Sequence, residues 1–421
     1  MYQIAAAAII TFTLSAFAVT IAKADETVLV PTPVPVPIFD VTFDVGLSAS
    51  EKSAHVAIEL GSGSEVVEWI RFRFDPLRYR SIEANGELVE HEGGIEWRPP
   101  AKGGELRYVY SIDHLRDDNS YDSRCAKSWA IMRGEDLVPR MRIRTVPVAR
   151  SESRMALRLP EGWSAALPYP RLIGGRYDLA NPRTRFDRPS GWFAFGKLGV
   201  VRETIEGTRI AVAGPADQGI RRMDLLALMK WTMPSLAKVF GKLPKRIQVV
   251  VAGDPMWRGG LSGPRSVYLH VDRPLIGHDS TSPLLHELVH SLMRANSGKD
   301  GNWVVEGLAE YYSIALLRRS KTLTASRYEA AIENIRERAA DGGSLRTAKV
   351  DSATRAKAVV VLMEIDDAIR DATGGDRSLD DVMRILAGNR KSVTTESFRE
   401  AIREVVGGDL DGIFDRHLPS R

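Results

Sequence analysis

Hydrophobic and polar positions divide the chain into two regions with different patterns. In the first region, residues 38–213, short segments alternate apolar and polar side chains, a period of two that is typical of strands with one buried face. Residues 54–60, 105–110 and 141–144 are clear examples. This pattern predicts an antiparallel, β-sandwich-like N-terminal domain over residues 38–213.

The second region, residues 214–421, has the pattern of helices with a few buried strands. A helix is predicted over residues 218–240, where Pro234 is expected to kink or interrupt it. The apolar segments 246–252 and 266–270 predict strands. Five further helices are predicted over residues 324–340, 353–372, 378–388, 395–405 and 409–417. The predicted fold class is therefore α+β multidomain, with a helical C-terminal part.

The first residues have the composition of a targeting segment. Residues 4–22 are apolar apart from four Thr or Ser residues, and they end in Ala22-Lys23-Ala24, a small-residue cleavage pattern. We therefore expect a signal peptide over residues 1–24 and a periplasmic or secreted protein without stable membrane insertion after cleavage. An uncleaved N-terminal membrane anchor is the alternative. Proline alternates with small residues next, which predicts an extended linker over residues 25–37.

Charge and cysteine content narrow the class of protein. The net charge is only +4, the pI is about 9.0, and the basic residues are spread along the chain without interleaved aromatics. This argues against a nucleic-acid partner. A single cysteine, Cys125, cannot form an intrachain disulfide, and we expect it to behave as a small buried hydrophobe.

The motif with the clearest chemistry is His286-Glu287-Leu288-Val289-His290. Two histidines four residues apart on a helix project from the same face, which suits two corners of a tetrahedral zinc site. Glu287 lies where it can take a proton from metal-bound water. Ser282 as cap and Pro283 as first residue predict where this helix begins. The alternative is an amphipathic helix with two polar positions and no metal.

A second helix follows after a short polar, glycine-containing segment. It is predicted from about Trp303 to Arg318, with Asn302 as its cap. Glu306 and Glu310 are four residues apart and so share one face. We assign Glu306 to the metal, and Glu310 as acceptor of the outer N–H of a ligating histidine. The alternative for Glu310 is a solvent-exposed helix carboxylate.

These two segments together resemble a known family. The order His-Glu-x-x-His, a loop, and then Trp-x-x-Glu-Gly-x-Ala-Glu-Tyr resembles the gluzincin zinc metallopeptidases, over about residues 258–312. The glycyl-aminopeptidase-like and aminopeptidase-N-like branches are most similar, and thermolysin is a more distant relative. The resemblance implies a thermolysin-like catalytic domain with one zinc ion per chain. It implies that His286, His290 and Glu306 are the ligands and Glu287 is the general base.

Two departures from the family pattern concern substrate binding and transition-state stabilisation. The stretch 259–264 lacks the glutamate with which the aminopeptidase-N-like branch holds a free amine. The family's later tyrosine, which steadies the oxyanion, is also absent, and Arg355 lies in the matching context. The candidate oxyanion donors are Tyr268, His270, His278 and Arg355. Of these, we rank Arg355 first.

In thermolysin-like folds, the strand before the zinc helix binds the substrate backbone as an added strand. Gly259, Gly260 and Tyr268 lie in the corresponding segment and are the expected substrate-binding residues. The two glycines permit close approach of the substrate backbone. The predicted function is a zinc metallopeptidase that hydrolyses peptide or protein substrates with zinc-activated water. Without the amine-holding glutamate, an endopeptidase or an enzyme with a different anchor is favoured. The alternatives are a catalytically silent zinc-binding module, chaperone-like in role, and a zinc hydrolase with another substrate.

Overall fold

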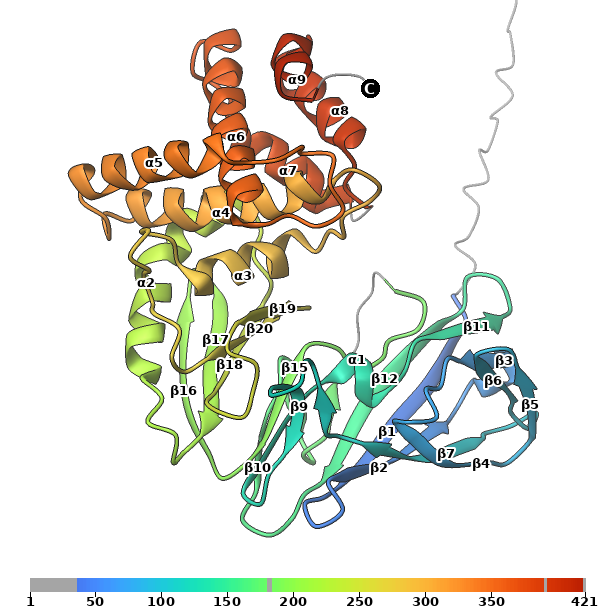
Figure 1. The fold of residues 1–421 in the computed structure, drawn as a ribbon. Coiled ribbons are helices and arrows are strands. Elements are labelled where there is room, and N and C mark those ends of the chain that lie inside the picture. The colour runs from blue at the N-terminus through green and yellow to red at the C-terminus, as the bar shows by residue number, and fades with distance from the viewer. Residues whose placement is uncertain (1–35, 180–183, 390–391, 419–421) are drawn as a thin grey trace, which may run out of the picture. The chain divides into compact units, whose positions relative to one another are not determined.

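Both regions predicted from the periodicity are present in the computed structural model, which describes residues 36–179, 184–389 and 392–418 (Figure 1). The expected signal peptide and nearly all of the expected linker lie outside these residues. From Pro37 onward, the described chain forms one unit. In this part of the chain no helix has the length and apolar character needed to cross a bilayer.

Three sheets make up the β-rich N-terminal region. The first has six strands in the order β14 (Tyr177–Asp178), β12 (Arg150–Arg158), β1 (Ile38–Ser48), β2 (Ser53–Leu60), β7 (Glu105–Ser111) and β4 (Tyr79–Ala84). The second has the order β13 (Ser164–Ala166), β15 (Trp192–Gly196), β10 (Trp129–Arg133), β9 (Tyr121–Cys125) and β8 (His114–Leu115). The third has the order β11 (Met141–Thr145), β3 (Val67–Phe72), β6 (Gly94–Arg98) and β5 (Glu87–His91).

The inward faces of these sheets share one apolar core, as a β-sandwich-like domain requires. Cys125 belongs to this core, and burial raises the pKa of its thiol to about 11. One pair departs from the predicted antiparallel arrangement, because β1 and β12 run parallel from Ile38 beside Arg150. Two short helices connect strands in this region, η1 (Ser64–Val66) and α1 (Gly134–Leu137).

A fourth sheet belongs to the second region and corrects the predicted boundary at residue 213. Its order is β16 (Leu198–Ile205), β17 (Thr208–Pro215), β18 (Arg246–Ala252), β20 (Ser266–His270) and β19 (Gly260–Gly263). β17 pairs in parallel with β18 across the predicted boundary, so the second region begins near Leu198. The signals of β16 and β17 were assigned to the first region because alternation marks a strand and not the sheet it joins.

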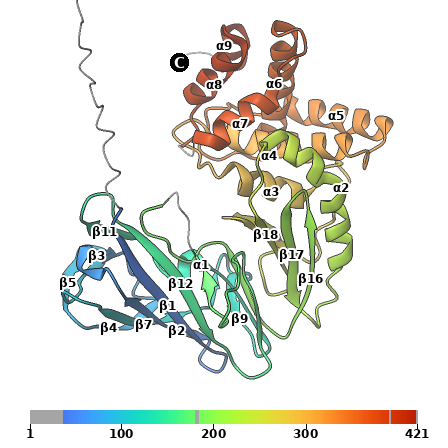
Figure 2. The ribbon, with the colours of Figure 1, turned by 180° about the vertical axis from the view of Figure 1, so that it is seen from behind.

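Helices cover one face of this sheet, and Figure 2 shows them from behind. The first is α2 (Arg222–Phe240), which continues through Pro234, so the expected interruption does not occur. α3 (Pro283–Met293) packs on β19 and β20, and α4 (Asn302–Arg319) packs on α3. The remaining helices are α5 (Ala325–Ala340), α6 (Ser352–Ala372), α7 (Leu379–Asn389), α8 (Thr395–Val406) and α9 (Asp411–His417). Each matches a predicted helix within two residues.

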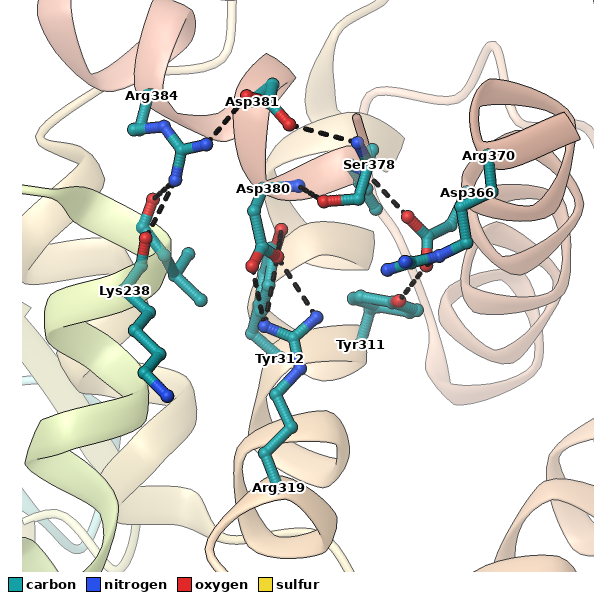
Figure 3. A network of polar contacts seen from close by, with 12 residues as sticks. Lys238, Tyr311, Tyr312, Arg319, Asp366, Arg370, Ser378, Asp380, Asp381 and Arg384 are labelled. Atoms are coloured by element: carbon teal, nitrogen blue, oxygen red, sulfur yellow. Dashed lines mark hydrogen bonds and ion pairs between the residues drawn. The ribbon is translucent and has the colours of Figure 1, made fainter. Parts of the chain in front are cut away.

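A network of charged side chains fixes α7 against α2 and α4 (Figure 3). Asp380 accepts hydrogen bonds from the Arg319 guanidinium at 2.8–3.0 Å and from the Tyr312 hydroxyl at 2.9 Å. Arg384 of α7 donates to the carbonyl oxygen of Lys238 on α2 at 2.7 Å. Arg319 and Tyr312 lie on α4, so this network holds in place the helix that also carries Glu306 and Glu310.

Replacing Asp366 with Ala should destabilise this helical region by about 2–4 kcal/mol. Asp366 is buried, accepts from Leu379 N at 2.7 Å, and accepts from the Tyr311 hydroxyl at 3.1 Å. Its removal leaves both donors without this partner. Thermal denaturation would measure the loss. Asp367→Ala, at the exposed neighbouring position, is the control and should change stability by less than about 0.5 kcal/mol; equal effects would contradict the prediction.

Candidate metal centre

The helix α3 presents both histidines because its start is fixed by a cap. The hydroxyl of Ser282 accepts from the backbone N–H of Leu285 at 3.4 Å, and Pro283 is the first helical residue, as predicted. The apolar face of α3 is buried against the sheet and α4. His286 and His290 therefore project together on the remaining face, with ring centroids 4.8 Å apart.

The helix α4 carries the two carboxylates to the same place. Its cap is Gly301 and not Asn302, which is the first helical residue and donates its side-chain amide to the carbonyl oxygen of Ala348 at 3.0 Å. Sequence could not exclude Asn302, because asparagine is a common cap. α4 packs along α3, and this contact places Glu306 opposite the histidines.

Donor atoms of three side chains converge with a spacing close to that of a metal site. Nε2 of His286 and Nε2 of His290 are 3.1 Å apart. The Glu306 oxygens lie 3.7 Å from the first nitrogen and 3.5 Å from the second. Ligands of a tetrahedral zinc ion with bonds of about 2.0–2.2 Å lie about 3.3–3.6 Å apart. Among the described residues, these three form the one group of His, Cys, Asp or Glu side chains arranged to hold a metal.

Glu310 orients one of these histidines. Its Oε2 lies 3.0 Å from Nδ1 of His286, and only 12% of each side chain is exposed. With Nδ1 donating to this carboxylate, the Nε2 lone pair of His286 faces the site. The structure therefore brings Glu310 to the position assigned from its spacing, and it does not leave Glu310 as a solvent-exposed carboxylate.

The protonation tendencies of the three donor residues differ. Burial disfavours the charged form of His286, but hydrogen bonds to Glu306 and Glu310 outweigh it and raise its pKa to about 9. Burial and the nearby His286 lower the pKa of His290 to about 4. Burial opposes ionisation of Glu306, yet the hydrogen bond with His286 and the charges around it lower the pKa of Glu306 to about 2.

Glu287 lies between the histidine pair and the edge strand β19. Burial raises the pKa of this carboxyl group, and a hydrogen bond from the backbone N–H of Ser262 partly offsets that effect. A Cβ atom at Gly260 would lie 2.7 Å from Cγ of Glu287, so only glycine allows β19 to pass this closely. Gly260 therefore lies against Glu287, and its role in substrate binding stays a prediction. Gly259 instead accommodates the ring of Trp257.

Arg355, near the start of α6, is also brought to the site. Its Nε lies 3.6 Å from Oε2 of Glu306, and this nitrogen is buried without a hydrogen-bond partner among the described residues. The positive charge of Arg355 contributes to the lowered pKa values of Glu306 and His290.

Two of the other three candidate oxyanion donors, Tyr268 and His270, do not face the site. Tyr268 is fully buried, packs on Trp192 with ring centroids 5.1 Å apart, and donates its hydroxyl to the carbonyl oxygen of Trp257. Side chains alternate along β20, so Tyr268 and His270 point to the face opposite α3. Tyr268 therefore does not bind substrate either. His278 is exposed, and its role as an oxyanion donor stays a prediction.

Sequence reasoning missed the residues that fix β19 and β20 from the N-terminal region. The Trp192 indole donates to the carbonyl oxygen of Leu261 at 2.9 Å, and the Trp192 backbone N–H donates to Ser266 Oγ at 2.7 Å. The guanidinium of Arg133 lies over the Trp192 ring, 4.6 Å from its centroid. These residues are more than 60 positions from β19 in the sequence, so local patterns could not have linked them.

Zinc binding to the metal-free protein should release about one proton at pH 7. His286 is protonated there because its pKa is raised to about 9, while His290 is neutral and Glu306 is ionised. A ligating imidazole must be neutral, so log affinity should rise with a slope of about one between pH 6 and pH 8. Calorimetry in buffers of different ionisation enthalpy measures the released proton. Heats that do not depend on the buffer, together with a zinc affinity that does not change between pH 6 and pH 8, would contradict the prediction.

Comparisons with known proteins support the fold. No family model matches the sequence, and no curated protein matches it. An aminopeptidase N family protein from Idiomarina loihiensis is similar in structure, with a TM-score of 0.69, 13% identity, and coverage of 90% of this chain and 76% of that chain. An M1 zinc metallopeptidase from Deinococcus radiodurans is similar with a TM-score of 0.57, 15% identity, and coverage of 92% and 93%. A mutant of this peptidase bound to a Tyr-Ser-Ala substrate has a TM-score of 0.60. At this identity the likeness shows the fold, and it confirms the gluzincin-like fold predicted from the motif.

Proposed function

We propose that this protein is a zinc-dependent metallopeptidase. The observation that carries the proposal is the convergence of His286, His290 and Glu306 from two helices, with Glu287 beside them and Glu310 holding His286. A purely structural zinc site does not need a carboxylate beside its ligands. The mutant of a protein with similar fold that binds Tyr-Ser-Ala supports a peptide as the substrate.

The side chains would divide the work of hydrolysis. A zinc ion held by the three ligands would lower the pKa of bound water to about 7 and polarise a carbonyl group. Glu287 would take a proton from water and deliver it to the departing amine. Its raised pKa favours this role, because a general base works best when its pKa lies near the working pH.

Arg355 is the proposed stabiliser of the charge that develops on the substrate oxygen. Its guanidinium lies against Glu306, and a buried N–H of Arg355 has no acceptor among the described residues. A cationic donor in such a position can replace the missing tyrosine hydroxyl. β19, with Gly260 at its start, is the edge strand along which substrate backbone would bind.

Secretion or periplasmic export is part of the proposal. It is supported by the apolar residues 4–22 and the cleavage pattern that follows them. Membrane anchoring by the same segment is the alternative. A second candidate function, a catalytically silent zinc-binding module, is favoured by one observation, which is the absence of the oxyanion tyrosine from the sequence context occupied by Arg355.

A peptide-library digestion followed by mass spectrometry tests the proposed function. We expect cleavage by the zinc-loaded protein, loss of cleavage after chelation, and recovery when zinc is added back. Bound zinc measured in the same samples is the control, since it separates an empty site from a silent one. Stoichiometric zinc without cleavage of any peptide would favour the silent module.

A further inference from the structure

A large cavity opens beside the metal centre and is unusually rich in arginine. Its volume is about 880 Å³, and its lining includes His290 together with Ser262 and Gly263 from β19. Six arginines from separate parts of the chain also line it, namely Arg73, Arg78, Arg133, Arg140, Arg188 and Arg294. The cavity is therefore continuous with the candidate catalytic groups and strongly basic.

Acidic side chains in the lining do not balance this charge. Asp75, Glu135 and Asp136 are the acidic lining residues, three against six arginines. Asp136 pairs with Arg78 at 3.3 Å, while Glu135 accepts from the backbone N–H of Gly191 at 2.8 Å. The lining thus has an excess of three positive formal charges, which attracts anions and repels a free amine.

Several of these guanidinium groups retain donors for a ligand. Arg188 donates to the carbonyl oxygens of Glu135 and Val138. The carboxylates of Glu135 and Asp136 favour its charged form, although neither forms a recorded ion pair with it among the described residues. In the described chain, no ion pair with a carboxylate is recorded for Arg73, Arg133 or Arg140. An arginine fork matches the two oxygens of a carboxylate, and such pairs are among the stronger hydrogen bonds in proteins.

Arg133 connects the basic cavity to the reacting groups. It lies on the Trp192 ring, and the Trp192 indole holds the carbonyl oxygen of Leu261 in β19. The hydroxyl of Ser291 on α3 holds Gly263 of the same strand at 2.8 Å. A peptide that lies along β19 beside Glu287 would therefore extend into the field of Arg133 and its neighbours.

We propose that the arginine-lined cavity binds a carboxylate of the substrate, so that acidic peptides are preferred. The inference rests on the proposed function and names its substrate class. Peptides carry this group on Asp and Glu side chains and at the C-terminus, and the volume accommodates either one. Attraction between charges in a partly enclosed cavity is stronger than at an exposed surface, and it weakens as salt is added.

Binding to the Glu287→Gln protein tests the inference without requiring turnover. Four fluorescent octapeptides form the probe set, with three internal Glu or three internal Gln residues and with a free or amidated C-terminus. We expect the peptide with both kinds of carboxylate to bind about 10–100-fold tighter than the peptide with neither, at low salt. The two mixed peptides show whether side chains or the terminus supply the preference.

Variants at two cavity positions, made in the same background, assign the preference to the cavity. Arg133→Met keeps an apolar side chain against Trp192 and should reduce the preference about tenfold, while Arg133→Lys should restore part of it. Arg140→Gln changes an exposed residue and keeps the test informative if Arg133→Met disturbs packing. Arg336→Gln on α5 removes the same charge from an exposed position outside the cavity lining and should leave the preference intact.

Equal affinities for the four peptides would overturn the inference, as would the absence of measurable binding. A preference that survives both Arg133→Met and Arg140→Gln would also overturn it. If the wild-type protein cleaves no peptide but the Glu287→Gln protein retains the arginine-dependent preference, the proposed hydrolysis fails and the carboxylate site stands.

Discussion

Replacing Glu287 with Gln is expected to remove turnover while about one zinc ion per chain stays bound. Glutamine has nearly the same shape and can still accept the hydrogen bond from the Ser262 backbone N–H. It cannot take a proton from water at neutral pH. The metal-binding group, His286, His290 and Glu306, is unchanged, so zinc content should not fall.

The expected loss follows from the part that proton transfer plays in hydrolysis. General acid–base catalysis contributes about 10²–10⁴-fold, equivalent to about 3–5 kcal/mol of barrier, and here one residue serves both transfers. The turnover number should therefore fall by at least about 10²-fold, with little change in substrate affinity. Steady-state kinetics on the best library peptide, with zinc measured in the same samples, gives both quantities.

A matched control removes one carboxylate charge elsewhere. Glu337→Gln on α5 changes an exposed side chain and should retain wild-type turnover. Equal activity of wild type and Glu287→Gln would dismiss Glu287 as the base. Loss of zinc in Glu287→Gln would instead indicate that the residue supports the metal centre.

The helices and the convergence of His286, His290 and Glu306 could be predicted from sequence because their signals are local. Ser282 and Pro283 mark the start of α3 within the same turn that they stabilise. The spacing of His286 from His290, and of Glu306 from Glu310, places each pair on one helix face whatever surrounds the helix. Packing of α3 on α4 then needs only a short connection to bring the pairs together.

The orientation of β20 shows where such reasoning ends. Its side chains alternate, but both faces of the strand are buried, so the pattern does not reveal which face α3 covers. Val267 and Leu269 face the helices, while Tyr268 faces the core that contains Trp192. The error for Tyr268 therefore came from tertiary packing and not from a wrong strand assignment.

The basic cavity was invisible in the sequence for a related reason. Its arginines are spread between positions 73 and 294, so the local sequence does not show that they converge in one cavity. The net charge of +4 for the whole chain gave no sign of a local excess. Only the folded chain gathers Arg133 of β10 and the five other arginines, which lie outside helices and strands, beside His290.

Replacing Glu306 with Ala is expected to weaken zinc binding on the order of 10³-fold or more, whereas Glu310→Ala should weaken it about 10–100-fold. Glu306 supplies a charged donor atom, and its loss also leaves Arg355 beside the histidines without its carboxylate. Glu310 only orients His286 through the 3.0 Å contact with Nδ1. The order of the two effects is therefore a direct test of which carboxylate binds the metal.

Zinc affinities measured by competition with a chromogenic chelator at pH 7.5 would give this order. Glu329→Ala, at an exposed position on α5, controls for the loss of one negative charge and should bind zinc like the wild type. A larger loss for Glu310→Ala than for Glu306→Ala would reverse the ligand assignment. His286 and His290 alone leave two corners of a tetrahedron to solvent, so the loss of a third ligand should be measurable. Unchanged zinc affinity in both variants would therefore show that α4 does not contribute to the metal centre.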